Sequence, residues 1–360
     1  MSKTRESYVR PLDLKHGRVE LAHGSGGRAM AQLIEELFAR HFDNAYLRQG
    51  DDGAVLPMPR VDNANGVPVP AGRLVMSTDA HVVSPLFFPG GDIGSLAVHG
   101  TINDVAMMGA TPLWLSASFI LEEGFALADL ARIVVSMAQA SREAGVPVVT
   151  GDTKVVEQGK ADGVYITTAG IGVLAEGVTL SGNRARPGDL VLLSGSIGEH
   201  GMAIMAAREN LEFASPIVSD SAALHGLVAA MLATGADIRC LRDPTRGGVA
   251  TTLNEIARQS GVGMLLDEAA IPVQPAVAGV CEFLGLDPLY VANEGKLLAV
   301  VAAADAERVL AVMRAHPLGQ HAARIGEVIV DSHHFVQMTT GLGGTRIVDW
   351  LNGDPLPRIC

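Results

Sequence analysis

Apolar residues recur at helical spacing in four stretches of the chain. In residues 28–42 they are Met30, Leu33, Ile34, Leu37 and Phe38, the i, i+3, i+4, i+7, i+8 stripe of an amphipathic helix. The same spacing predicts helices over 127–144, 249–259 and 305–316, and Gly145 follows the second of these as a predicted C-cap. We expect all four stripes to face a core and assign them no chemistry.

Shorter apolar and β-branched runs predict strands at 74–78, 146–150, 164–174, 190–194, 297–303 and 325–330. Helices and strands alternate only loosely, and no GxGxxG motif joins them, so a Rossmann unit is disfavoured. We predict an α+β arrangement in each half. The turn-rich stretch 175–188 is the best candidate boundary, giving domains at 1–175 and 188–344 and a flexible tail at 345–360.

Composition places the chain among folded proteins with large cores. Its 360 residues are 48% hydrophobic and 18% charged, with a net charge of −12. That charge disfavours nonspecific binding to nucleic acid and to anionic membranes. The N-terminus lacks the apolar core of a signal peptide, and the charge-free run 105–121 is broken by Gly and Pro, so it is a poor membrane span. Three cysteines without CxxC spacing fit a reducing compartment, and we expect a cytoplasmic protein.

Four short motifs place aspartates near strand ends or in a helix. They are Asp51-Asp52-Gly53, Ser77-Thr78-Asp79, Asn103-Asp104 and Thr150-Gly151-Asp152-Thr153-Lys154. A single Asp in such a place is more often a turn or cap residue. Together the four favour a site in which carboxylates hold Mg²⁺ against a nucleotide phosphate, because Mg²⁺ takes oxygen ligands and keeps part of its coordination sphere for phosphate.

Two glycine-rich turns precede predicted helices, HGSGG at 23–27 and DPTRGG at 243–248. Such turns offer backbone N–H groups to anions, although neither matches the Walker A pattern. A sequence such as GSGG by itself is more often a plain flexible turn. Glu294, in the sequence Asn293-Glu294-Gly295-Lys296, lies just before an apolar strand. If partly buried it is a candidate general base; otherwise it is an ordinary exposed turn residue.

The last residue, Cys360, follows a segment with Pro355 and Pro357 that cannot continue a helix. About fifteen extended residues could carry its thiol roughly 50 Å. The tail is therefore either a swinging arm that presents one sulfur to several sites or a frayed terminus. Cys240 and Cys281 lie in apolar contexts and are expected to be structural.

Taken together, HGSGG, DDGAV, NDVAMMGA, VTGDTKVV, DPTRGGV, ANEGK and the terminal PRIC closely resemble the HypE family of hydrogenase maturation factors. The resemblance runs from about residue 23 to Cys360. It implies a two-domain PurM-like (AIR synthetase-like) fold, a homodimer formed by the N-terminal domains, and ATP near that interface. It also implies that HypF loads a carbamoyl group onto the terminal thiol, that ATP drives its dehydration to a thiocyanate, and that the HypC–HypD complex accepts the cyano group.

The resemblance also implies roles for particular residues. It assigns phosphate and nucleotide contacts to Asp51, Asp52, Thr78, Asp79, Asn103, Asp104, Gly151, Asp152, Thr153, Gly247 and Gly248, and Mg²⁺ to Asp52, Asp79, Asp104 and Asp152. Cys360 is the covalent carrier and Glu294 the leading base. Lys154 stabilises phosphate charge or transfers a proton, and Arg246 holds the phosphorylated intermediate.

Two alternatives differ in what they require of Cys360. Another ATP-dependent kinase or synthetase of the same superfamily would not need a terminal thiol. A selenophosphate synthetase places its reactive residue in the N-terminal segment, and this chain has no cysteine before Cys240. A non-enzymatic sulfur carrier would need the thiol but not the acidic motifs.

Overall fold

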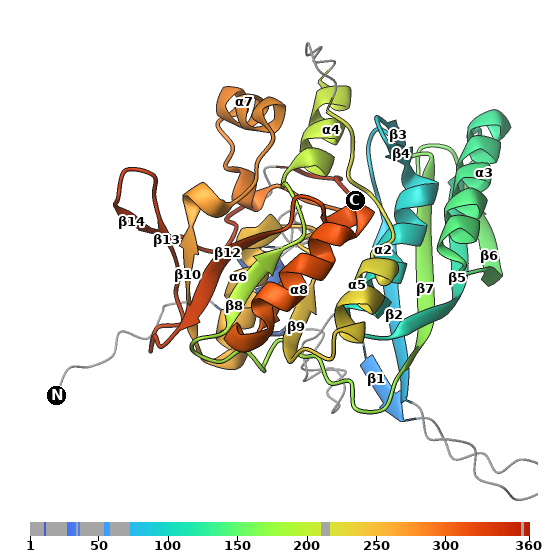
Figure 1. Ribbon diagram of the computed structural model, residues 1–360. Coiled ribbons are helices and arrows are strands. Elements are labelled where there is room, and N and C mark those ends of the chain that lie inside the picture. The colour runs from blue at the N-terminus through green and yellow to red at the C-terminus, as the bar shows by residue number, and fades with distance from the viewer. Residues whose placement is uncertain are drawn as a thin grey trace, which may run out of the picture.

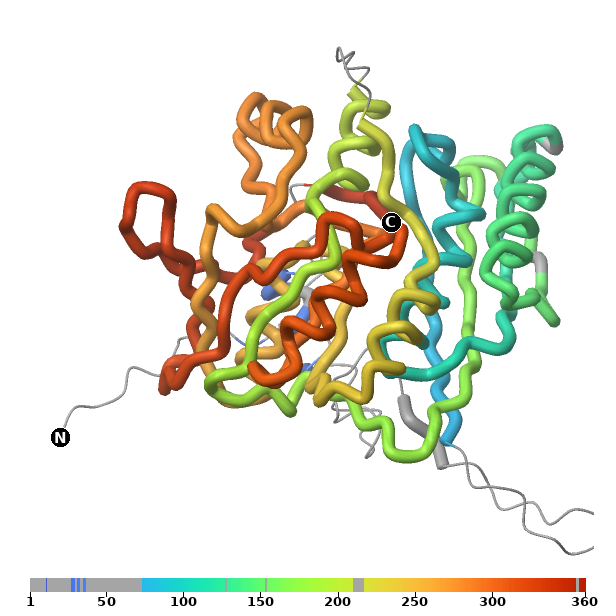
Figure 2. The backbone as a smooth tube through the Cα atoms, viewed as in Figure 1, coloured from blue at the N-terminus to red at the C-terminus, as the bar shows by residue number. Residues whose placement is uncertain are grey.

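The computed structural model of the chain describes residues 11, 27–33, 35–36, 54–57, 73–209, 217–353 and 356–360. Two sheets with their own helices lie next to each other, and the C-terminus lies between the two halves, below α4 (Glu199–Arg208) (Figures 1 and 2). Helix α1 (Arg28–Leu33) matches the start of the first predicted helix. The later part of that prediction, like Asp51 and Asp52, falls largely outside the described residues.

The N-terminal half is built on a five-stranded sheet in the order β1-β2-β7-β5-β6. Its strands are β1 (Ala54–Pro57), β2 (Arg73–His81), β5 (Thr111–Glu122), β6 (Val148–Val156) and β7 (Val164–Leu174). Only β5 and β6 pair in parallel. The helices are α2 (Ile93–Met107) and α3 (Leu127–Ala144), and the short strands β3 (Phe87–Phe88) and β4 (Gly91–Asp92) precede α2.

One face of this sheet is covered and the other is open. Along β7, buried residues alternate with partly exposed ones, the pattern of a strand that packs on one side only. Val164, Ile166 and Thr168 are buried on the side of α2. The opposite face carries large exposed apolar side chains, among them Met76, Trp114 and Ile120. An uncovered apolar sheet face of this kind is typical of a surface that binds a partner.

The start of α2 and the end of α3 carry recognisable capping signals. Asp92 caps α2 by accepting bonds from Gly94 N and Ser95 N at 2.7 and 3.2 Å, and Ser95 bonds back in a capping box. Helix α3 has the predicted bounds and ends at Gly145, whose φ of 68° is left-handed. The sequence prediction of that C-cap is confirmed.

The C-terminal half is built on a seven-stranded sheet in the order β14-β13-β10-β12-β8-β11-β9. Its strands are β8 (Leu190–Leu193), β9 (Ile238–Arg242), β10 (Gly263–Asp267), β11 (Leu298–Val301), β12 (Ala323–Ile329), β13 (Val336–Thr339) and β14 (Thr345–Ile347). Its helices are α4, α5 (His225–Ala233), α6 (Gly248–Ser260), α7 (Pro275–Leu284) and α8 (Ala303–Ala315).

Both faces of this second sheet are buried where it is made of β8, β11 and β9. Val191 and Leu193 pack with the apolar side of α6, whereas Leu192, between them, packs with α5 and α8. Successive side chains of a strand point to opposite faces, so a sheet covered on both sides needs unbroken apolar runs. This explains why β8 and β11 read as continuous hydrophobic stretches.

Several elements differ from the predictions. Strand β6 extends to Val156, so the Gly151–Asp152 motif lies within the strand and not beyond its end; Ser77-Thr78-Asp79 likewise lies inside β2. The run 105–121 divides into the end of α2 and the unpredicted strand β5. Strand β14 falls inside the predicted tail, so the chain leaves the sheet only after Ile347. No helix among the described residues is long and apolar enough to span a membrane.

Asn103, on α2, ties the two halves together. Its side-chain amide donates to the carbonyl oxygens of Ala222 and Glu294 at 3.0 and 3.3 Å, and its oxygen accepts from Leu224 N at 2.7 Å. The residue is 1% exposed. Buried polar groups cost stability when they lose their partners, so the hydrogen bonds of this amide hold α2 against the C-terminal half.

We expect N103A to lower the free energy of unfolding by more than about 2 kcal/mol, because it removes three hydrogen bonds to the backbone and takes from Ala222 O and Leu224 N the side-chain partner that binds them. Urea denaturation measures the effect. The matched variant N183A, at an exposed asparagine, should change stability by less than about 0.5 kcal/mol. Equal stability of the two variants would contradict the role of Asn103.

Candidate functional site

The terminal thiol lies among four segments that are far apart in sequence. They are the end of the tail, the loop before β11, the loop before α6 and strand β2. The electrostatic neighbours of Cys360 are Arg246, Glu294 and Asp79. Sequence motifs identified separately therefore meet around one sulfur atom.

Glu294 is the buried acid of this site, with 3% of its surface exposed. Its Oε1 atom has no hydrogen-bond partner within the described part of the chain. Burial raises the pKa of Glu294 well above 4.5, and the charges of Asp79, Asp243 and Asp220 raise it further, while Arg246 opposes them. The structure thus favours the general-base interpretation of this residue over that of an exposed turn acid.

The backbone around Glu294 is fixed by side chains from other segments. Asp220 accepts bonds from Glu294 N, Gly295 N and Lys296 Nζ, each at 3.1 Å. The neighbouring Asn293 accepts from Gly198 N at 2.8 Å and donates to two backbone carbonyls. Gly295 packs so closely on the carbonyl of Asp220 that a Cβ atom would lie 1.7 Å from its oxygen, so a larger residue cannot occupy this position.

Cys360 is partly buried and shares a hydrogen bond with Glu294. Burial raises the pKa of its thiol well above 9.0; Arg246 acts in the opposite direction, and Glu294 and Asp79 add to the rise. Docking therefore favours the protonated thiol over the thiolate and places it beside the carboxyl group of Glu294. Cys240 and Cys281 are buried free thiols, as predicted.

Arg246 supplies the positive charge of the site. Negative charge on Cys360, in its thiolate form, raises the pKa of this guanidinium most; the charges of Asp79, Glu294 and Asp104 add to the effect, and burial opposes it. Arg246 comes from the turn before α6, where Gly247 and Gly248 have φ of 80° and 61°. The N–H of Gly248 donates to Thr245 O at 2.9 Å, so the structure gives this amide a partner other than the predicted phosphate.

Asp79 and Asp104 lie on the covered side of β2. Asp104, from α2, accepts from Ser77 Oγ at 2.6 Å, and Asp79 Oδ2 lies 3.2 Å from His81 Nε2. Burial would raise the pKa of Asp79, but His81 and, less strongly, Arg246 hold it well below its usual range. Asp79 is therefore a carboxylate near neutral pH.

Other predicted residues do not join this cluster. Thr78, between Ser77 and Asp79, is exposed on the open face of the sheet. Asn103 is committed to the backbone groups named above. Asp51 and Asp52 lie outside the described residues, as does the side chain of Thr153.

Asp152 and Lys154 form a second, separate location on the edge strand β6. They are ion-paired at 2.9 Å and both exposed. Across the sheet, Gly151 on β6 pairs with Ala117 on β5, Ala117 pairs with Thr168 on β7, and Thr168 pairs with Asp79 on β2. Gly151 and Asp79 are thus separated by three strand spacings, or about 14 Å. Oxygen ligands of one Mg²⁺ lie within about 4 Å of each other. Asp152 therefore cannot share a metal with Asp79 of the same chain.

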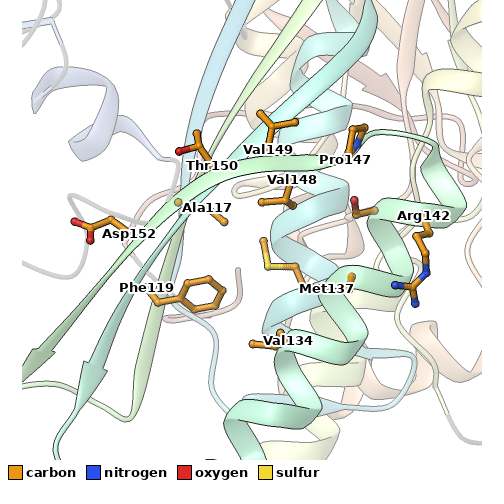
Figure 3. A pocket seen from close by; sticks show the side chains of 13 residues that line it. Ala117, Phe119, Val134, Met137, Arg142, Pro147, Val148, Val149, Thr150 and Asp152 are labelled. Carbon is orange, nitrogen blue, oxygen red and sulfur yellow. The ribbon is translucent and has the colours of Figure 1, made fainter.

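Beside Asp152 runs a groove between β6 and α3. Val148, Phe119, Val134 and Met137 point into it, whereas the carboxylate of Asp152 points away from α3 (Figure 3). The volume of the groove is about 850 Å³. Most of the lining is apolar, with Ser141, Arg142, Thr150 and Asp152 as the polar members, so the groove suits packing against another surface.

The described residues contain no group of three or more His, Cys, Asp or Glu side chains arranged to hold a metal ion. Mg²⁺ in nucleotide sites needs only one or two carboxylates in addition to phosphate oxygens and water. Asp79 and Asp104 on the covered side of β2 fit that requirement.

Several residues around the site carried no recognised signal in the sequence. Asp220, His81, His200 and Arg208 act through contacts with segments far away in the chain. His200 lies in the glycine-rich sequence Gly198-Glu199-His200-Gly201, and that pattern of small residues was its only available hint. A lone aspartate such as Asp220 gives none.

Comparison with protein families places both halves in one class. Residues 50–174 match the N-terminal domain, and 186–339 the C-terminal domain, of AIR synthase related proteins. The predicted two-domain PurM-like fold is confirmed. The segment between the two matched regions includes the turn-rich stretch between β7 and β8.

Within that class the chain is 68% identical over 353 residues to the carbamoyl dehydratase HypE of Cupriavidus necator, covering 98% of each protein. A crystal structure of a HypE–HypF complex is similar with a TM-score of 0.81 at 50% identity, covering 89% of this chain and 99% of that one. A structure of HypE in complex with ATP has a TM-score of 0.78 at 51% identity, covering 95% and 100%. The chain belongs to the HypE family and is a carbamoyl dehydratase of hydrogenase maturation, as its motifs predicted.

The raised pKa of Glu294 makes a prediction about stability. A carboxyl group whose pKa is higher in the folded than in the unfolded protein binds protons more readily when folded, so the free energy of unfolding falls as pH rises above its ordinary value of 4.5. We expect E294Q to be more stable than the unmodified protein by more than about 1 kcal/mol near pH 8. The difference should shrink as pH approaches 4.5.

Urea unfolding at several pH values measures this difference. The matched variant E123Q, at an exposed carboxylate, should show no such pH-dependent gain. An E294Q protein whose stability advantage stayed constant across the pH range would show that Glu294 is not held in an unfavourable charged state.

Proposed function

We propose that this chain carries out its dehydration on a carbamoyl group attached to Cys360, with Glu294 as the base and ATP as the activating substrate. The observation that supports this assignment is the docked thiol, which shares a hydrogen bond with the buried Glu294 side chain beside Arg246. ATP as substrate is proposed from the HypE relative whose structure is described as a complex with ATP.

The chemistry follows from what each group can supply. The oxygen of an S-carbamoyl group attacks the γ-phosphorus of ATP, the P–O bond to ADP breaks, and an N–H proton leaves. The C–O bond then breaks with loss of phosphate as the second N–H proton leaves, giving S–C≡N. In sum the carbamoyl group loses the elements of one water, and its oxygen departs on the phosphate.

Glu294 is placed to accept these protons. Once the sulfur is carbamoylated it has no proton to donate, and the amide nitrogen becomes the donor nearest the carboxylate. A raised pKa gives a carboxylate higher proton affinity, which suits a general base working near neutral pH. Arg246, charged and close to the sulfur, offsets the negative charge of the phosphorylated carbamoyl oxygen.

Mg²⁺ is proposed to bind Asp79 and Asp104, with Asp52 as a further ligand, and to neutralise phosphate charge. HypF is proposed as the carbamoyl donor because one HypE relative is described in complex with HypF, and the HypC–HypD complex as the acceptor of the cyano group. We also propose the division of the chain into domains at 1–175 and 188–344, with 345–360 as the segment that delivers the thiol.

A homodimer completes the nucleotide site in this proposal. A second copy would cover the open apolar face of the five-stranded sheet and the groove beside β6. Asp152 and Lys154 lie on β6, the edge strand, three strands and about 14 Å from β2, which carries Asp79. Because they cannot reach the metal of their own chain, they are assigned to the nucleotide of the other copy. Thr78, on the same open face, joins them at the interface.

The first test is intact-mass spectrometry in two stages. The protein is carbamoylated by HypF with carbamoyl phosphate and ATP, repurified, and divided between Mg-ATP and a non-hydrolysable analogue. We expect a carbamoyl adduct on Cys360 that loses the mass of one water only with hydrolysable ATP. ADP production with Cys360 unmodified would instead identify a superfamily kinase.

The same assay tests Glu294. We expect E294Q to accept the carbamoyl group but to dehydrate it about 10²–10⁴ times more slowly, the usual contribution of a general base. Since Glu294 must be ionised to act and its pKa is raised, the dehydration rate of the unmodified protein should rise with pH through a value well above 4.5. A rate independent of pH in that region would assign the base to another residue.

Mixing two inactive variants tests the shared site. D152A and E294Q each lack one part, so neither homodimer should dehydrate the carbamoyl group. A mixed dimer has one site in which Asp152 and Glu294 are both intact, and it should regain activity. Activity that stays absent after subunit exchange, with mixed dimers verified by mass, would place Asp152 in the site of its own chain or outside it.

A further inference from the structure

Residues 358–360 are docked by a contact to each of their backbone oxygens. Ser84 N donates to Arg358 O at 3.1 Å and Val82 N to Cys360 O at 3.2 Å, so the tail runs antiparallel to residues 82–84. The carbonyl between them, on Ile359, faces the other way and accepts from His200 Nε2 at 2.8 Å. The tail is therefore held from two sides, although it is not a regular strand, because Arg358 has a left-handed φ of 55°.

Helix α4 supplies both side chains of this contact. His200 is in its first turn, and Arg208 ends it. Arg208 donates through Nη2 to Arg358 O at 2.9 Å and to Ser84 O at 2.7 Å, thereby joining the tail to the strand it pairs with. Ile359 and Leu356 are buried in the core cluster that α4 also enters.

The state of the His200 ring follows from its partners. A carbonyl oxygen can only accept, so Nε2 carries the hydrogen. Nδ1 lies 2.8 Å from Ser219 Oγ and accepts from it in the neutral ring, and Phe88 packs edge-on against the ring at 5.5 Å. Burial lowers the pKa of His200, with Asp220 and the Ile359 carbonyl opposing it. The ring is thus a neutral, oriented donor aimed at one peptide group.

We propose that His200 is a positioning residue for the dehydration, and that its bond to Ile359 O sets the register that brings the sulfur of Cys360 against Glu294 and Arg246. Arg208 assists by holding the preceding carbonyl. The residue does not touch the reacting atoms. It acts one peptide away, since the carbonyl that it binds belongs to the residue before Cys360. This proposal rests on the function proposed above.

Two isosteric substitutions separate the two bonds of the ring. In H200Q the amide nitrogen can take the place of Nε2 and still donate to Ile359 O. In H200N the shorter amide reaches only the place of Nδ1 and leaves that carbonyl without a partner. H321N makes the same change at an exposed histidine and serves as the control. All three are compared for thermal unfolding with the unmodified protein.

The first readout is the alkylation rate of Cys360 by iodoacetamide, which needs neither ATP nor HypF. We expect H200N to react about ten times faster, since an unpaired buried carbonyl costs about the equivalent of a tenfold change in the docked population. H200Q and H321N should react at nearly the rate of the unmodified protein. Because this assay involves no carbamoyl chemistry, it tests the docking even if the proposed reaction is wrong.

The second readout is intact mass, which measures carbamoylation of Cys360 and dehydration of the carbamoyl group as separate steps. H200N should accept the carbamoyl group at least as fast as the unmodified protein and dehydrate it about ten times more slowly in a single turnover, with H200Q close to the unmodified protein. If H200N does not fold, R208M replaces it, since Arg208 is only partly buried, and the same pattern is expected. Unchanged alkylation in the folded variant, or H200Q as impaired as H200N, would overturn the proposal.

Discussion

The structure of the site depends on keeping one carboxylate, that of Glu294, away from water. A buried acid with a free oxygen is unfavourable for folding, and the surrounding elements are arranged to hold it there. Asp220 binds the backbone on one side of it, and Asn103 binds its carbonyl from the other half of the molecule. The result is a base whose position is set by the packing of two domains and not by its own loop.

The same seam between the halves receives the end of the chain. Residues 82–84 of the first half and α4 of the second bind opposite sides of the tail. Docking of the thiol therefore requires that the two halves pack together as they do here, because a shift of either half would remove its contacts to the tail. Chemistry, domain packing and tail position are coupled through a few hydrogen bonds.

Local patterns in the sequence predicted local structure well. Strand β7 and helix α3 have the predicted bounds because their signals are local: buried and exposed residues alternate along β7, and Gly145 directly follows α3. The family motifs likewise predicted the fold and the class of reaction. What depends on distant contacts was not predictable: the sheet order that separates Asp152 from Asp79, the partners that bury Glu294, and the histidine that meets the tail. Strand β14, inside the predicted tail, was missed for the same reason, because its partner is β13.

The protonated state of the docked Cys360 has a consequence for damage by oxidants. Peroxides and disulfides react with thiolates, and a thiol whose pKa lies well above 9.0 offers almost none at neutral pH. Docking therefore disfavours the formation of sulfenic acid and mixed disulfides at this sulfur. The contacts that hold the tail in place also preserve the chain's ability to be loaded again.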